Sequence, residues 1–393
     1  SAFRRSSASA AFRNKNYLVS VTESRRAGST PVGAALVAAL GQPQGLPLRR
    51  QPVRSAFRSR CNCEQELSQT PYDTETSNPV AQVTRSARTV AAWFWANVTV
   101  AAFGVWAIGE VFRDRFGITG IFFLVPTVVP AAALLVAALL AFACGCRRIA
   151  LAAGLLWLFP TFWLLFIENQ WVRPSPRGDA ARALRLVHWN VGPISGRPEL
   201  ITPVLAPLVA DAYVLSECFS VEASSKVTQA LGSDYKLYHI RQIALIARGD
   251  IKLGRGDERM PTRLYTLEWE SVYGPVKVMA VDLPSRPIYS RRPWLEQVFD
   301  RVLYTRPDLV VGDFNARRRS HWLGRLPRGY AHAYEEAGRG WCYSWPDAFP
   351  LWDIDQCILG PRIRPIAHGF LPTGVSDHRL QWFDFSIAPT PAP

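Results

Sequence analysis

Several short apolar runs in the C-terminal half of this chain end in residues that suit metal and phosphate chemistry. Residues 310–312 are apolar or glycine, and the chain then presents Asp313 and Asn315. On an extended segment these two side chains point to the same side, so one strand delivers two polar groups to one place. Three similar runs end in polar residues of the same kinds: Asn190, Glu217 and the pair Asp377-His378. Such strand ends are suited to a site that binds a metal ion and a phosphate group.

Hydrolysis of a phosphate ester or anhydride requires a cation to neutralise the phosphoryl oxygens, a positioned water and donors for the charge of the transition state. The oxygen atoms of Glu217, Asp377 and Asn190 are hard ligands. Hard oxygen ligands in small number suit Mg²⁺, with Mn²⁺ as the alternative. The residue types therefore predict a metal-dependent hydrolase.

Five motifs lie in one order over about two hundred residues: His188–Val191, Leu215–Glu217, Gly312–Ala316, Ile354-Asp355 and Ser376–His378. Together they resemble the endonuclease/exonuclease/phosphatase family, which has a DNase I-like fold. The resemblance covers the C-terminal half only. It implies an α/β fold, a four-layer α/β sandwich in which two packed, mostly antiparallel sheets carry outer helices.

The resemblance also implies a role for each matching residue. Asp313 would orient and activate the attacking water, and Asn315 would donate to a phosphoryl oxygen. His378, held by Asp355, would be the cationic partner of the phosphate, because a neighbouring carboxylate raises the pKa of an imidazole. The metal ligands would be Glu217, Asp377 and Asn190.

Two positions depart from the family pattern. Asp282 stands where many members have a histidine, and Asp353 stands where an arginine often precedes Ile-Asp. Asp282 could protonate the leaving group if its pKa is raised, recruit a second metal, or restrict the enzyme to substrates with good leaving groups. A catalytically impaired membrane binding or sensor protein therefore stays open as an alternative.

Two arginine clusters follow strand ends of the predicted site. Arg317, Arg318 and Arg319 follow the Asn315 motif, and Arg292 belongs to a cluster after Asp282. We expect Arg292, Arg317 and Arg318 to line the rim of the site and bind a polyanionic substrate. A lipid-linked phosphate or pyrophosphate is favoured over DNA or RNA, because a tether holds the enzyme near the head groups and the C-terminal domain is only modestly basic. A nuclease remains the alternative.

The rest of the chain must position these residues, and its composition changes along its length. Residues 1–89 hold 13 Lys and Arg against 5 Asp and Glu, and they show no helix or strand period. We predict a disordered basic tail over 1–87, a membrane segment over 88–171, a linker over 172–182 and the catalytic domain over 183–388.

Three runs in the membrane segment carry no charge: Val90–Gly109, Phe116–Cys146 and Ile149–Ile167. Each is close to or above the roughly 20 residues that cross a bilayer as a helix, so we predict three transmembrane helices. Arg147 and Arg148 fill the short second loop. The positive-inside rule puts that loop in the cytoplasm and the catalytic domain on the extracytoplasmic side of the cell membrane.

From residue 184 onward, short apolar runs alternate with amphipathic stretches. Strands are expected at 186–189, 212–215, 243–247, 264–270, 276–282, 309–311, 352–359 and 380–386. Helices are expected at 200–209, 221–231 and 294–303. Many strands with few helices between them favour two packed sheets with helices outside, and residues 317–350 are expected to be a loop-rich insertion.

Overall fold

The computed structural model describes residues 79–254, 263–286 and 289–388, all within one compact unit, Thr74–Pro393. The predicted tail up to residue 78 lies outside the described residues. The first helix begins at Pro79, inside the segment predicted to be tail.

The predicted membrane segment forms α1 (Pro79–Phe112), α2 (Gly117–Phe123), α3 (Val128–Ala143) and α4 (Arg147–Phe162), and α4 continues as a π-helical turn over Trp163–Glu168. By length and apolar composition, Ser86–Phe112 and Arg147–Glu168 could each cross a membrane. The pair α2 and α3, bent by 60°, would be a third span if the two count as one. The second run predicted as a transmembrane helix, 116–146, is therefore divided into two helices, and a count of three spans requires the bent pair to be one span. Pro126 lies at the break, where a proline lacks the N–H that a continuing helix needs.

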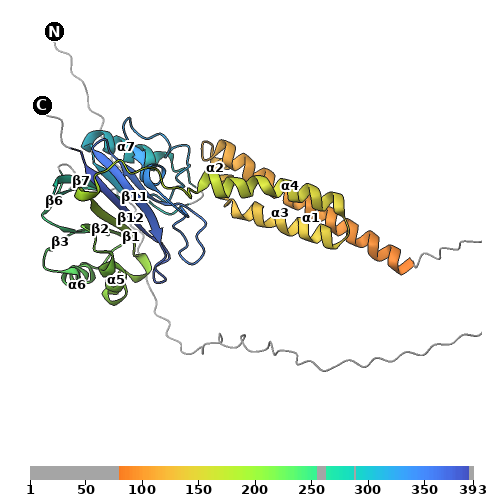
Figure 1. Cartoon of the computed structure of the whole chain (residues 1–393), viewed down its shortest axis with the longest axis horizontal. Coiled ribbons are helices and arrows are strands. Elements are labelled where there is room, and N and C mark those ends of the chain that lie inside the picture. The colour runs from red at the N-terminus through yellow and green to blue at the C-terminus, as the bar shows by residue number, and fades with distance from the viewer. Residues whose placement is uncertain (1–78, 255–262, 287–288, 389–393) are drawn as a thin grey trace, which may run out of the picture. The chain divides into compact units, whose positions relative to one another are not determined.

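Two six-stranded sheets form the C-terminal part (Figure 1). The first has the order β11-β12-β1-β2-β4-β3 and the second β5-β6-β7-β8-β10-β9. The strands of the first sheet are β1 (Leu184–Asn190), β2 (Ala212–Ser216), β3 (Tyr235–Ile240), β4 (Ile243–Arg248), β11 (Ile363–Leu371) and β12 (Leu380–Ile387). Those of the second are β5 (Ile251–Leu253), β6 (Leu264–Ser271), β7 (Gly274–Asp282), β8 (Leu309–Asp313), β9 (Ala331–His332) and β10 (Asp355–Leu359). Only the pairs β1–β2 and β7–β8 are parallel.

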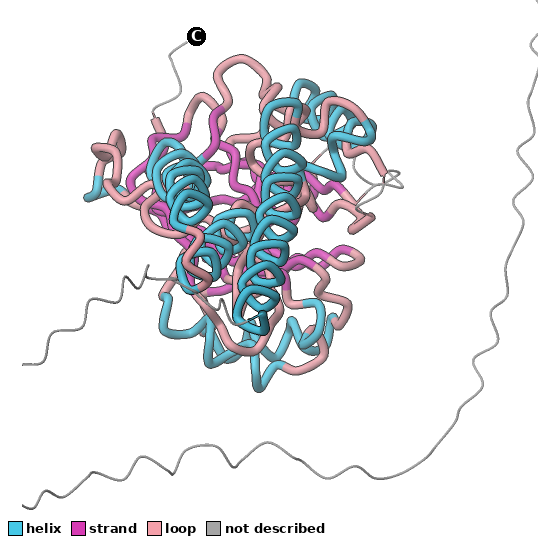
Figure 2. Tube along the Cα trace, turned by 90° about the vertical axis from the view of Figure 1, so that its right-hand side faces the viewer, coloured by secondary structure: helices cyan, strands magenta, loops and turns pink. Residues whose placement is uncertain are grey.

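Three apolar cores hold the layers together. The central core joins inward-facing residues of both sheets, such as Leu186 of β1 and Val278 of β7. A second core packs α5 (Pro198–Leu205) and α6 (Val221–Leu231) on the first sheet, and a third packs α7 (Arg292–Thr305) on the second. The helix–sheet–sheet–helix order is the predicted α/β sandwich. Figure 1 shows α1, α3 and α4 side by side, and Figure 2 separates helices from strands by colour.

The segment predicted as a linker over 172–182 packs against the first sheet. The backbone amides of Arg177 and Gly178 both donate to the carbonyl of Pro365 in β11, at 2.9 and 3.0 Å. The amide of Asp179 donates to Ser386 Oγ in β12. This segment therefore covers part of β11, one of four edge strands (β3, β5, β9 and β11) that the sequence did not predict.

Candidate active site

Three aspartates lie side by side at the ends of neighbouring strands in the second sheet. Asp313 of β8 is paired in register with Asp282 of β7 and with Asp355 of β10. Gly312, at φ +153°, passes so close to β7 that an added Cβ would lie 1.8 Å from the carbonyl oxygen of Val281. A glycine is therefore required immediately before Asp313, because no side chain fits between these strands.

Asn190 connects this row of acids to the first sheet. Its Nδ2 donates to Asp313 Oδ2 at 3.1 Å and to Glu217 Oε1 at 3.3 Å. Its Oδ1 accepts from the backbone amide of Gly192 at 3.0 Å. Glu217 has a left-handed φ of +52° just after β2, which turns the chain as the strand ends. One amide thus holds two carboxylates from different sheets close together.

His378 and Asp355 form a buried hydrogen-bonded pair. His378 Nδ1 lies 2.8 Å from Asp355 Oδ2, and His378 Nε2 lies 3.8 Å from Asp313 Oδ2. Burial alone would lower the pKa of His378, but the carboxylates of Asp355 and Asp313 raise it to about 10. The imidazole is therefore a cation near neutral pH, with one nitrogen fixed by Asp355 and the other facing Asp313.

Asp313, like Asp282 and Asp355, is a buried carboxylate. Burial, followed by the negative charge of Asp355, raises its pKa well above the usual value of an aspartate. The backbone amide of Asn315 donates to Asp313 Oδ1 at 2.8 Å, and Asn315 Nδ2 donates to the carbonyl of Leu283 at 2.8 Å. Asn315 has a left-handed φ of +47°, so the chain turns directly after the acid.

Asp377 is exposed at the edge of the group. Its Oδ2 accepts from Trp345 Nε1 at 3.1 Å, and its negative charge is one of the causes that raise the pKa of His378. Ser376 fixes the turn, since its hydroxyl donates to the carbonyl of Asn190 at 2.7 Å. The structure thus brings together Asn190, Glu217, Asp313, Asn315, Asp355, Asp377 and His378 from five separate motifs.

The donor set fits a divalent cation. Within the described residues, Glu217 has no cationic partner, and its Oε1 lies near the same amide nitrogen as Asp313 Oδ2. Two carboxylates so close together favour a cation between or beside them. The described residues that by distance alone could hold a metal are Asp313, Asp355 and His378. A protonated His378 cannot ligate, so the side of the group with Glu217 suits a metal better.

Asp282 is buried beside these groups. Burial raises its pKa to about 6, although Arg263 at 3.5 Å and a hydrogen bond from Gln242 oppose the shift. A carboxyl group with this pKa exchanges its proton near neutral pH. That property matches the first of the three roles that the sequence left open for Asp282.

The predicted arginine rim is wrong for Arg317 and Arg318, because both side chains are buried. Arg317 Nη1 lies 3.0 Å from Glu110 Oε1 in α1, and Nη2 lies 2.9 Å from Glu168 Oε1. Arg318 Nη2 donates to the carbonyl of Glu168 at 2.9 Å. These arginines join the C-terminal sandwich to the predicted membrane segment, a pairing that the sequence did not predict.

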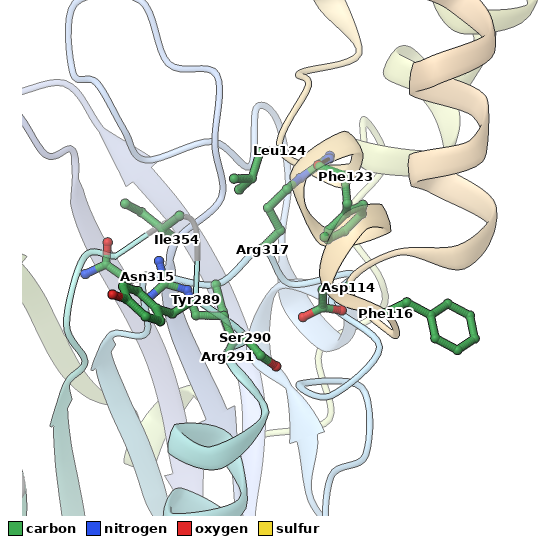
Figure 3. A pocket seen from close by; sticks show the side chains of 13 residues that line it. Asp114, Phe116, Phe123, Leu124, Tyr289, Ser290, Arg291, Asn315, Arg317 and Ile354 are labelled. Atoms are coloured by element: carbon green, nitrogen blue, oxygen red, sulfur yellow. Dashed lines mark hydrogen bonds between the residues drawn. The ribbon is translucent and has the colours of Figure 1, made fainter.

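Arg292 is exposed on α7, where it pairs with Glu296 at 2.7 Å. Its guanidinium group also lies over the ring of Trp322. Its neighbour Arg291 instead lines a pocket with Asn315 (Figure 3). Arg291 belongs to the same cluster after Asp282, and the sequence could not tell which member of the cluster lies beside Asn315.

Sequence reasoning missed two supporting residues. His188 lies in a quoted motif without an assigned role, and its Nδ1 lies 3.8 Å from Asp355 Oδ1. Burial lowers the pKa of His188 to about 4, so it stays neutral beside Asp355. Trp345 lies in the insertion after β8 and could be found only through its contact with Asp377.

Comparisons with known proteins give distant likenesses. No family model and no curated protein matches this chain. Similar solved structures include a humanized TDP2 of D. rerio with 18% identity and a TM-score of 0.44, covering 52% of this chain and 99% of that one. An endonuclease/exonuclease/phosphatase family protein of Bacteroides thetaiotaomicron has 14% identity and a TM-score of 0.42, with coverages of 52% and 97%. An endonuclease/exonuclease/phosphatase from Beutenbergia cavernae has 15% identity and a TM-score of 0.41, covering 54% of this chain and 73% of that one. With TM-scores this low, the function must be argued from the site itself.

Proposed function

We propose that this chain is a membrane-anchored, divalent-metal-dependent phosphoesterase that hydrolyses a phosphate ester or anhydride. The observation that carries the proposal is the convergence of Asn190, Asp313 and the His378–Asp355 pair at the meeting ends of two sheets. Buried acids beside a fixed imidazolium are costly to fold, and such groups concentrate at functional sites.

In the proposed reaction, Asp313, His378 and Asn315 each act through a specific atom. The ionised Asp313 accepts a proton from water as the water oxygen forms a bond to phosphorus. The bond from phosphorus to the leaving oxygen breaks, and that oxygen keeps the electron pair. His378 donates from Nε2 to a phosphoryl oxygen while Asp355 holds Nδ1, and the second N–H of Asn315 is available to the same phosphoryl group.

Glu217, Asn190 and Asp377 would hold Mg²⁺ or Mn²⁺, as the resemblance implies. A bound divalent cation would neutralise charge on the phosphoryl oxygens. Asn190 fits this arrangement because its amide already joins Glu217 to Asp313. The imidazole that protonates the leaving group in many family members is absent, and Asp282 with its raised pKa would supply that proton.

The membrane segment supports a substrate held in the bilayer. Two or three helices suit membrane spans, and the domain contacts them directly through Arg317. Arg147 and Arg148 favour a cytoplasmic second loop, which would put the catalytic domain on the extracytoplasmic side. A lipid-linked phosphate or pyrophosphate then reaches the site by lateral diffusion.

A substrate panel tests this function on the full chain in lipid nanodiscs with Mg²⁺. The substrates are single-stranded DNA, duplex DNA, inositol phosphates and a polyprenyl pyrophosphate. We expect phosphate release from the polyprenyl pyrophosphate. Turnover of nucleic acids alone would make the chain a nuclease. If neither the panel substrates nor simple phosphate esters are hydrolysed, the result would favour an impaired binding protein.

A further inference from the structure

A pocket lies between the membrane segment and the catalytic strand ends (Figure 3). On the catalytic side it is lined by Asn315 and by Ile354, which directly precedes Asp355. On the membrane side it is lined by Gly117, Gly120 and other residues of α2. The pocket therefore adjoins two residues of the proposed site and one helix of the apolar membrane segment.

The walls of this pocket are chemically divided. Phe123, Leu124 and Ile354 supply apolar surface. Asn315, Ser290, Arg291 and Arg317 supply the polar part, together with Asp114, whose carboxylate accepts from the Ser320 hydroxyl and the His321 backbone amide. An occupant that satisfies both parts is an amphiphile with an anionic head near Asn315 and an apolar chain against α2.

Arg291 is the pocket's available cation. Within the described part of the chain, Arg291 makes no ion pair, and its one hydrogen bond goes to the carbonyl of Pro284. Arg317 also lines the pocket, but Glu110 and Glu168 already hold its guanidinium group. A phosphate bound next to Asn315 would therefore find its unshared positive partner in Arg291.

The pocket opens where a lipid could enter. Phe116 is 50% exposed and points away from the pocket in Figure 3, while Ile118 and Ile121 of α2 are 62% and 45% exposed. Apolar side chains that project from a membrane segment are covered by acyl chains. The 60° bend between α2 and α3 means that α2 does not continue the line of α3.

We propose that this pocket binds the apolar chain attached to the phosphate of a membrane-borne substrate, with Arg291 contacting the phosphate. The proposal rests on the phosphoesterase activity proposed above and specifies its substrate class. It also explains why α2 is packed against the catalytic strand ends. Gly117 and Gly120 leave the space open, because an added Cβ would meet no atom within 4 Å at Gly117 and only Asp114, at 3.6 Å, at Gly120.

The test compares methyl, butyl and octyl esters of p-nitrophenyl phosphate, with the full chain in nanodiscs and each ester fully dissolved. All three release p-nitrophenolate at the same bond, so only the chain differs. We expect kcat/KM to rise at least about tenfold from methyl to octyl, the gain from burying about two methylene groups. Gly117→Leu and Gly120→Leu should each bring the ratio of kcat/KM for the octyl ester to that for the methyl ester close to one. Arg291→Met should lower kcat/KM for all three esters by a similar factor.

Gly154→Leu is the matched control, since Gly154 of α4 also has open space around its Cα and does not line this pocket. The Gly154→Leu variant should keep the rise in kcat/KM from the methyl to the octyl ester. Loss of this rise in Gly154→Leu would overturn the proposal, and so would equal kcat/KM values for all three esters in the unaltered protein. Absence of turnover with every ester would instead defeat the phosphoesterase function. If both pocket variants lose activity even with the methyl ester, a second experiment compares inhibition of the unaltered protein by octylphosphonate and by methylphosphonate. The proposal requires stronger inhibition by octylphosphonate, and equal inhibition refutes it.

Discussion

Nδ1 of His378 lies 2.8 Å from Oδ2 of Asp355, and both side chains are buried. The carboxylate holds the ring with Nε2 toward Asp313 and keeps it protonated against the effect of burial. The charge that we assign to phosphate binding therefore depends on a residue that does not itself contact the substrate.

Asp355→Asn should lower kcat on the order of 10² to 10⁴-fold, because a neutral amide cannot sustain the imidazolium. The sign of the pH effect follows from the pKa. In the unaltered protein His378 stays charged until the pH approaches about 10, whereas in the variant burial lowers its pKa. The residual activity of the variant should thus fall with rising pH at lower pH values than in the unaltered protein. The pH profile of kcat/KM measures this, with Asp300→Asn on the surface of α7 as the control; coincident profiles for Asp355→Asn and the unaltered protein would contradict it.

Glu217→Gln should raise the Mg²⁺ concentration for half-maximal activity by about 10 to 100-fold. The amide keeps the shape of the side chain and can still contact Asn190, but it supplies no negative charge to a cation. Excess chelator should abolish activity in the unaltered protein, and Mg²⁺ or Mn²⁺ should restore it. Full activity in chelator would show that Glu217 and Asp313 need no metal.

Asp282→Asn should affect substrates according to their leaving groups. With p-nitrophenolate, which leaves without protonation, the loss should stay below about tenfold. With an alkyl ester the unaltered enzyme should slow as pH rises through about 6, where Asp282 loses its proton, and the variant should lack this dependence. Equal and severe losses for Asp282→Asn and His378→Ala with p-nitrophenyl esters would instead make Asp282 a metal ligand.

Arg317→Met should destabilise the full chain by about 3 to 5 kcal/mol, since it leaves Glu110 and Glu168 buried without their cation. Thermal melting in detergent should show a drop on the order of 10 °C. Arg292→Met is the matched control, because its exposed pair with Glu296 contributes less than about 1 kcal/mol. Equal melting temperatures for the two variants would refute the buried junction.

A reporter that is active only outside the cytoplasm, fused after the last residue, should be active. The basis is the basic loop of Arg147 and Arg148, which the positive-inside rule places in the cytoplasm. A fusion in that loop should behave in the opposite way. Activity of a cytoplasmic reporter at the C-terminus would reverse the predicted orientation.

The sequence predicted the α/β sandwich and named the polar residues that the structure places close together, because local patterns carry both. Polar residues after apolar runs marked strand ends such as that of β8. The edge strand β11 was missed, since its glycine, proline and charged residues hide the alternation. The arginine pairing was missed for another reason: Glu110 and Arg317 are 207 residues apart, and no local pattern records such a contact.

The buried arginines also limit where this protein can be truncated. A fragment that begins at the predicted domain boundary, residue 183, would lose Glu110 and Glu168 and keep Arg317, Arg318 and Arg319. These three neighbouring arginines would then keep only Asp353 and Glu335 as acidic partners among their described ion pairs. A surface that carries these arginines attracts any polyanion, including nucleic acid, through charge alone. DNA binding by the truncated domain would therefore reflect the surface that truncation exposes. The substrate of the intact protein must be sought with its helices in place.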